Sequence, residues 1–123
     1  MEGKDLLTEK IINCCFKVHN ELGPGFKERI YHNALKLFLD EEGLKYETEK
    51  AFEVNVKGER VGSFKLDLII EDKVIVELKA VTGYIPEVFK YQLLSYLKVS
   101  DLHIGLLINF GSKSCQVKRF VHK

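Results

Sequence analysis

The stretch from Phe64 to Ala80 reads FKLDLIIEDKVIVELKA and predicts the centre of the fold. Two short runs rich in Val, Ile, Leu and Phe, residues 64–70 and 74–80, flank the polar triplet 71–73. This is the pattern of two strands joined by a tight hairpin turn. We therefore expect an antiparallel pair of strands here, with the triplet as its loop.

Three charged residues interrupt these apolar strands: Asp67, Glu77 and Lys79. Side chains of a strand alternate between its two faces, so Glu77 and Lys79 share one face of the second strand. If Ile70 faces Val74 across the turn, the antiparallel register puts Asp67 directly opposite Glu77. The sequence thus predicts that the three charged side chains converge.

Two facing carboxylates need a positive partner, because at about 5 Å they repel by about 3 kcal/mol at an effective dielectric constant of ~20. Lys79 could supply that charge in an ordinary cross-strand ion cluster on a half-exposed sheet. A hard divalent cation could supply it instead, since Mg²⁺ and Mn²⁺ bind carboxylate and water oxygens. The residues alone leave both interpretations open, and a short acidic pattern by itself favours the ion cluster.

Composition indicates one compact α/β domain covering residues 1–123, because a chain of 123 residues that is 46% hydrophobic can bury one core. The net charge is +1, so no overall basic excess points to nucleic acid. The first residues, MEGKDLLTEK, lack an apolar signal core, and no apolar run approaches the ~18 residues of a membrane span. We expect a cytoplasmic protein that does not enter a membrane.

The three cysteines, Cys14, Cys15 and Cys115, have neither the even number of a disulfide framework nor the C-x-x-C spacing of a zinc site. We expect them to be reduced thiols in the core.

Periodicity predicts the element order ααβββαββ, an α/β fold with a mixed central sheet flanked by helices. The expected helices are residues 5–22, 26–42 and 86–98, and the expected strands are residues 44–56, 64–70, 74–80, 103–110 and 114–121. Gly58-Glu59 is the expected turn between the first two strands. The second helix shows an apolar face made of Ile30, Ala34, Leu37 and Phe38. The residues expected in the sheet core are Leu66, Leu68, Val76, Leu78, Leu106 and Ile108.

Two further polar pairs lie at helical spacing. Glu28 and Tyr31 are three residues apart at the start of the second helix, and Gln92 and Tyr96 are four apart in the third. An acid at a helix N-terminus and a polar pair on a helix surface are both common without any function.

The order of these motifs resembles a known family. Residues 25–31 read G-x-x-E-x-x-Y, and VIVELKA, QLLSYL and GLLINFG follow in that order. The chain looks like a GxxExxY-family protein, similar over nearly its whole length to the PD-(D/E)xK nuclease superfamily. The resemblance implies a restriction-endonuclease-like core.

In that resemblance Asp67, Glu77 and Lys79 match the D…(D/E)-x-K core, although Leu66 stands where the superfamily often has proline. Glu28 matches the helical acid that often completes the metal site. The resemblance therefore implies that Asp67, Glu77 and Glu28 hold Mg²⁺, with Mn²⁺ as a substitute, and that Lys79 positions the attacking water.

Gln92 and Tyr96 match the Q-x-x-x-Y motif, which implies contact with a nucleic-acid backbone. Tyr31 is expected either to flank an unpaired end or to be an ordinary core tyrosine. The implied function is a metal-dependent nuclease, with DNA preferred to RNA. The rival is a non-catalytic binding or accessory module that kept the fold, for example as a homodimer.

Overall fold

The computed structural model describes residues 5–123 as an α/β fold with a five-stranded sheet of order β1-β2-β3-β4-β5. The order ααβββαββ is as predicted, with ends that differ by a few residues. The elements are α1 (Leu6–Leu22), α2 (Glu28–Glu41), β1 (Tyr46–Val56), β2 (Glu59–Ile70), β3 (Val74–Lys79), α3 (Glu87–Ser100), β4 (Ile104–Asn109) and β5 (Gln116–Val121).

The sheet is mixed, as the hydrogen bonds at the strand ends show. β1–β2 and β2–β3 are antiparallel pairs. The N–H of Phe110 donates to the carbonyl of Lys79 at 2.9 Å, so the carboxyl ends of β3 and β4 meet and these strands run parallel. The N–H of His122 donates to the carbonyl of His103 at 2.8 Å, which joins the end of β5 to the start of β4 and makes that pair antiparallel.

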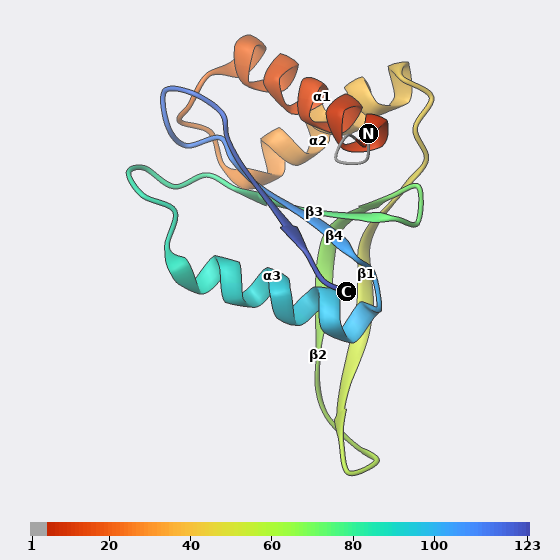
Figure 1. Ribbon diagram of the computed structural model, residues 1–123. Helices are drawn as coiled ribbons and strands as arrows, with labels where there is room; N and C mark the ends of the chain where they lie inside the picture. Colours follow the sequence, from red (N-terminus) through yellow and green to blue (C-terminus); the bar gives the residue numbers. More distant parts are fainter. Residues whose placement is uncertain (1–4) are drawn as a thin grey trace. The chain divides into compact units, whose positions relative to one another are not determined.

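The chain divides into two compact units. The first unit comprises the described part of Met1–Lys45 together with Leu78–Ile85 and Ile108–Val117, and in it α1 packs against α2 (Figure 1). The second unit comprises Tyr46–Glu77, Pro86–Leu107 and Lys118–Lys123.

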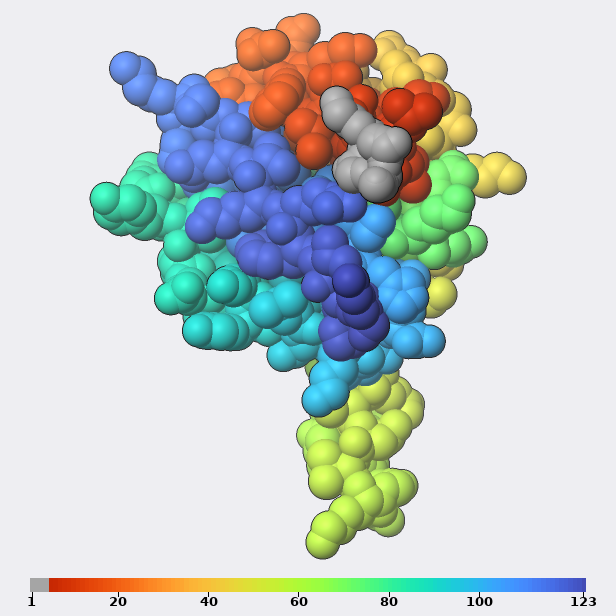
Figure 2. All heavy atoms as spheres, viewed as in Figure 1, coloured from red at the N-terminus to blue at the C-terminus, as the bar shows by residue number. Residues whose placement is uncertain are grey.

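Within the second unit, α3 contacts β1, and the ribbon formed by β1 and β2 extends well past α3 (Figure 1). The turn at the end of this ribbon stands clear of the rest of the second unit in the space-filling view (Figure 2).

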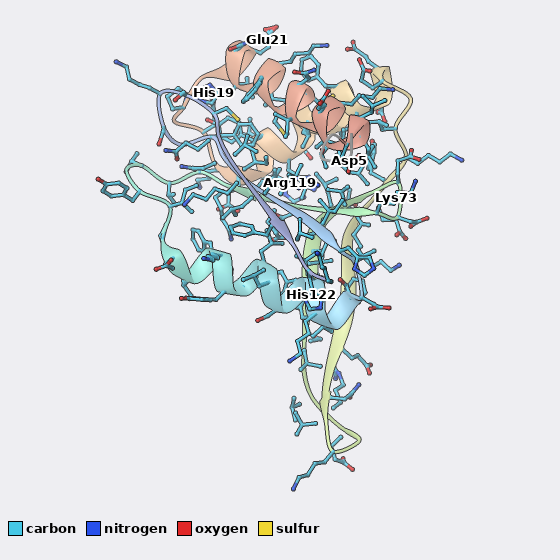
Figure 3. The ribbon with its side chains drawn as sticks, in the orientation of Figure 1. Asp5, His19, Glu21, Lys73, Arg119 and His122 are labelled. Atoms are coloured by element: carbon cyan, nitrogen blue, oxygen red, sulfur yellow. The ribbon has the colours of Figure 1, made fainter. Side chains whose placement is uncertain are left out.

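Helix α1 has a clear start and end in the sequence. The carboxylate of Asp5 accepts from the N–H of Leu7 at 3.0 Å, which caps the first turn. At the other end the N–H of Gly23 donates to the carbonyl of His19 at 2.7 Å. Figure 3 shows Asp5 and His19 toward opposite ends of α1.

The predicted apolar face of α2 is wrong by about one residue. Ile30 is 43% exposed and Leu37 is 67% exposed, whereas Tyr31 is fully buried. The Tyr31 ring stacks on Phe110 with centroids 4.5 Å apart, and its hydroxyl donates to the carbonyl of Gly23 at 2.6 Å. The larger ring with a satisfied hydroxyl takes the interior position, because it buries more apolar area than isoleucine.

The hairpin between β1 and β2 turns one residue earlier than predicted. Val56 pairs with Glu59, so Lys57 and Gly58, not Gly58 and Glu59, form the two-residue loop. Both loop residues have positive φ, 54° and 80°, as a type I′ turn requires. Strand β2 therefore begins at Glu59, well before the predicted residue 64.

The predicted sheet core is confirmed. All six residues are at most 1% exposed: Leu66, Leu68, Val76, Leu78, Leu106 and Ile108. Packing is close where α3 crosses β4, because a Cβ added at Gly105 would lie 2.9 Å from Cδ1 of Leu93. The glycine thus permits the helix to approach the strand.

We predict that Gly105→Ala lowers the free energy of unfolding by about 1–3 kcal/mol, because the added methyl group overpacks the contact with Leu93. Gly62→Ala is the matched control, since a Cβ at Gly62 meets no atom within 4 Å. Urea denaturation of both variants measures the difference. Equal stabilities for the two variants would refute the close helix–strand contact.

Candidate functional site

The β2–β3 hairpin has the predicted register, with the triplet 71–73 as its turn; Figure 3 marks Lys73 there. The paired residues are Leu68 with Val76, Ile69 with Ile75 and Ile70 with Val74. Continuing the register places Asp67 opposite Glu77, and the N–H of Asp67 donates to Oε2 of Glu77 at 2.9 Å. The side chain of Glu77 thus accepts the hydrogen bond of a β2 backbone N–H at the point where the backbone pairing of β2 with β3 ends.

The residue Glu77 is only 7% exposed, and the neighbouring Asp67 is half-buried. Glutamates are rarely buried without a compensating partner, because removing a carboxylate from water is costly. The hydrogen bond from Asp67 compensates part of that cost. Two carboxylates in adjacent positions, one of them buried, form a local concentration of negative charge.

Tyr96 on α3 interacts electrostatically with both carboxylates. The pKa of its hydroxyl is raised, first by burial and then by the negative charges of Glu77 and Asp67. Its ring also stacks on Phe64 of β2, with centroids 4.3 Å apart. Three predicted site residues, Asp67, Glu77 and Tyr96, therefore come together within the second unit. Gln92 lies one turn earlier on α3 and is exposed.

Three other predicted site residues belong to the first unit. Lys79 is the half-buried last residue of β3, two positions after Glu77 and so on the same side of that strand. Glu28 is the exposed first residue of α2. The predicted contact of Tyr31 with nucleic acid is not supported, because its ring is buried against Phe110.

Asn109 is a buried polar residue that sequence reasoning missed. Its Oδ1 accepts from the N–H of Val81 at 2.9 Å and of Gly111 at 3.1 Å. Its Nδ2 donates to the carbonyl of Val81 at 2.9 Å and to Oε1 of Gln116 at 2.8 Å. Asn109 therefore fixes the backbone two residues after Lys79. The available signal was an amide side chain at the end of an otherwise apolar strand.

The carboxylate oxygens of Asp67 and Glu77 are of the kind that a hard divalent cation binds. Among residues 5–123, no group of three or more His, Cys, Asp or Glu side chains is arranged to hold a metal ion. The Asp67–Glu77 pair still provides carboxylate oxygens from two residues. Mg²⁺ in phosphate-processing sites is typically bound by one or two carboxylates, with water and substrate oxygens completing the shell.

The cysteines are free thiols, as predicted. Cys14 and Cys15 are buried, and burial raises the pKa of each. Burial also raises the pKa of Cys115 to about 11. A thiol with a raised pKa is a poor nucleophile and a poor metal ligand at neutral pH, so these residues serve packing.

Comparison with known families identifies the fold. The family model described as the PD-(D/E)XK nuclease superfamily matches residues 5–120. The chain belongs to this superfamily. The α/β fold with a mixed sheet flanked by helices agrees with that assignment and with the predicted restriction-endonuclease-like core.

A solved structure titled "Crystal structure of SSO0001" has a similar fold, with a TM-score of 0.60 and 23% sequence identity. The similarity covers 76% of this chain and 49% of that one, so this nuclease-superfamily chain spans about half the length of the solved chain. No curated protein matches the sequence. Within the described residues, no helix has both the length and the apolar character needed to cross a membrane.

We predict that Asp67→Asn lowers the pKa of Tyr96, because it removes one of the two negative charges that disfavour the phenolate. The ionisation is followed by ultraviolet absorbance in chelator, as the difference between each protein and its Tyr96→Phe counterpart. An unchanged Tyr96 titration would show that the Asp67 carboxylate does not face the hydroxyl.

Proposed function

We propose that this chain is a Mg²⁺-dependent phosphodiesterase that cleaves nucleic acid, preferring DNA to RNA and accepting Mn²⁺ in place of Mg²⁺. The observation that carries the proposal is the buried residue Glu77, whose carboxylate accepts a hydrogen bond from the N–H of Asp67, the acidic residue opposite it in the hairpin register. Membership of a nuclease superfamily makes a phosphate-processing metal the best explanation for such a pair.

In this proposal Asp67 and Glu77 hold the metal. A bound divalent cation lowers the pKa of a coordinated water and polarises a phosphoryl oxygen. Glu28 is proposed as a supporting acid, on the basis of its place in the G-x-x-E-x-x-Y motif.

Lys79 is proposed as the residue that orients the attacking water. Its position two residues after Glu77 on β3 supports this role, because it places a cation on the same side of the strand as the carboxylate. The ammonium group would also offset the negative charge that develops on the phosphate in the transition state.

Gln92 and Tyr96 are proposed to hold the nucleic-acid backbone. The Tyr96 hydroxyl is protonated at neutral pH, as in any tyrosine, and its raised pKa does not change this, so it can donate a hydrogen bond to a phosphate oxygen. Gln92 is exposed on the same face of α3, at the spacing of one helical turn.

We further propose that the chain is a member of the GxxExxY branch, that residues 1–123 act as one nuclease domain, and that the protein is cytoplasmic. The G-x-x-E-x-x-Y motif at residues 25–31 supports the first point. The match of the superfamily over residues 5–120 supports the second. The three free thiols support the third, since thiols persist in a reducing compartment.

The second candidate is a non-catalytic binding or accessory module, for example a homodimer. The net charge of +1 favours it, because a near-neutral chain attracts a polyanion weakly. Metal binding separates the candidates. A ligand at a hundred times its dissociation constant stabilises the folded state by about 2.7 kcal/mol, and a module without a working site gains none of this.

We predict that Mn²⁺ stabilises the wild type and supports cleavage of DNA. Lys79→Ala should keep the stabilisation but cut cleavage by about 10²- to 10⁴-fold, because it removes a positioned group without removing a metal ligand. Asp67→Asn should lose both. Denaturation midpoints with and without Mn²⁺, alongside cleavage of single- and double-stranded DNA and RNA, measure these effects.

Asp72→Asn is the matched control, because the same change of group is made in the exposed β2–β3 turn, where an asparagine tolerates the positive φ of 56°. It should behave as the wild type. A wild type with no metal-dependent stabilisation and no cleavage of any polymer would favour the binding module.

A further inference from the structure

Charge is distributed unevenly along the chain. Residues 102–123 contain none of the 18 acidic residues, although the chain as a whole is nearly balanced. The same segment contains four of the 19 basic residues: Lys113, Lys118, Arg119 and Lys123. Such a local excess of one sign creates a positive surface that the net charge conceals.

Three of these residues lie on β5 or just after its end. Lys118 and Arg119 belong to β5, Lys123 follows two residues after its end, and all three are exposed. We call these three residues the β5 strip. They belong to the second unit, and β5 is an edge strand of the sheet. The C-terminal segment that carries them is exposed on the face shown in Figure 2, and Figure 3 marks Arg119 on β5.

The charges of the β5 strip are available to a ligand. Among residues 5–123, no carboxylate lies within ion-pair distance of Lys118, Arg119 or Lys123. The strand itself is held in place, because His103 and His122 make two hydrogen bonds: N–H of His122 to the carbonyl of His103, and Nδ1 of His103 with the carbonyl of His122, both at 2.8 Å. The backbone that carries the strip is thus held beside His103, with Lys118 and Arg119 on opposite faces of β5.

The spacing of the strip suits a phosphodiester backbone. Arg119 and Lys123 are four residues apart, a span of at most about 13 Å along the chain. One strand of a duplex carries a phosphate about every 3.4 Å along the helix axis, so cations over such a span can meet more than one phosphate. Edge strands also carry charges that prevent aggregation, but acidic residues would serve that purpose too, and residues 102–123 have none.

We infer that the β5 strip binds the phosphate backbone of a nucleic-acid strand and so extends the substrate contact beyond the scissile phosphate. This inference rests on the proposed function, since it assigns the polymer that the candidate site would cleave. The acidic pair Asp67–Glu77 repels a polyanion, and the net charge of +1 supplies little general attraction. A dedicated cationic strip on the same unit supplies the attraction that binding needs.

The test measures binding without cleavage. Fluorescence anisotropy follows a labelled single-stranded oligodeoxynucleotide in chelator, over about 50–200 mM salt. We expect the triple variant K118Q/R119Q/K123Q to weaken binding at least about tenfold at low salt. The slope of log affinity against log salt should fall in magnitude by about 2, because each lost phosphate contact contributes about 0.7.

The matched control is K10Q/K17Q/K36Q, which removes three positive charges from α1 and α2. It should change the affinity less than about threefold and leave the salt slope unchanged, because it alters only the net charge. Equal losses in the two triple variants would overturn the inference. So would a strip variant that aggregates but binds as the wild type does.

Cleavage separates this inference from the proposed function. The small diester bis(4-nitrophenyl) phosphate is too short to span the strip, so the strip variant should cleave it at the wild-type rate. On a polymer the same variant should lose kcat/KM and keep kcat. A wild type that cleaves neither substrate refutes the nuclease proposal alone, and the anisotropy measurement then still decides whether the strip binds nucleic acid.

Discussion

The pairing of Ile70 with Val74 across a tight turn is the constraint on which the candidate site depends. Because side chains alternate along a strand, this one pairing sets every opposite pair of β2 and β3. It sends apolar residues to the core and brings Asp67 opposite Glu77. A slip of one residue would turn each side chain of one strand to the other face, which would separate the carboxylates.

The carboxylate pair lowers the stability of the fold around it. Glu77 is a buried charge in a strand whose neighbours Val76 and Leu78 are core residues. An apolar residue of similar size would avoid the desolvation cost. The buried amide of Asn109, by contrast, is compensated by four hydrogen bonds. A costly acidic pair in an otherwise consistent fold is the feature expected of a functional site.

Alternation and turn chemistry were sufficient to predict the element order, the sheet core and the Asp67–Glu77 register from the sequence. These features follow from local periodicity, which the sequence displays directly. The face of α2 was mispredicted because Tyr31 gains its buried position from Phe110, a partner distant in the sequence. The role of Asn109 was missed for the same reason, since its partner Val81 is 28 residues away.

The central claim is that register-paired carboxylates form a metal site in this nuclease-superfamily chain. The most direct measurement is a crystal structure of the protein with Mn²⁺, with the ion located by its anomalous scattering. The account predicts a Mn²⁺ peak bonded to carboxylate oxygens of both Asp67 and Glu77, at about 2.0–2.2 Å. A Mn²⁺-saturated crystal without such a peak, in which Lys79 alone balances the two carboxylates, would contradict it.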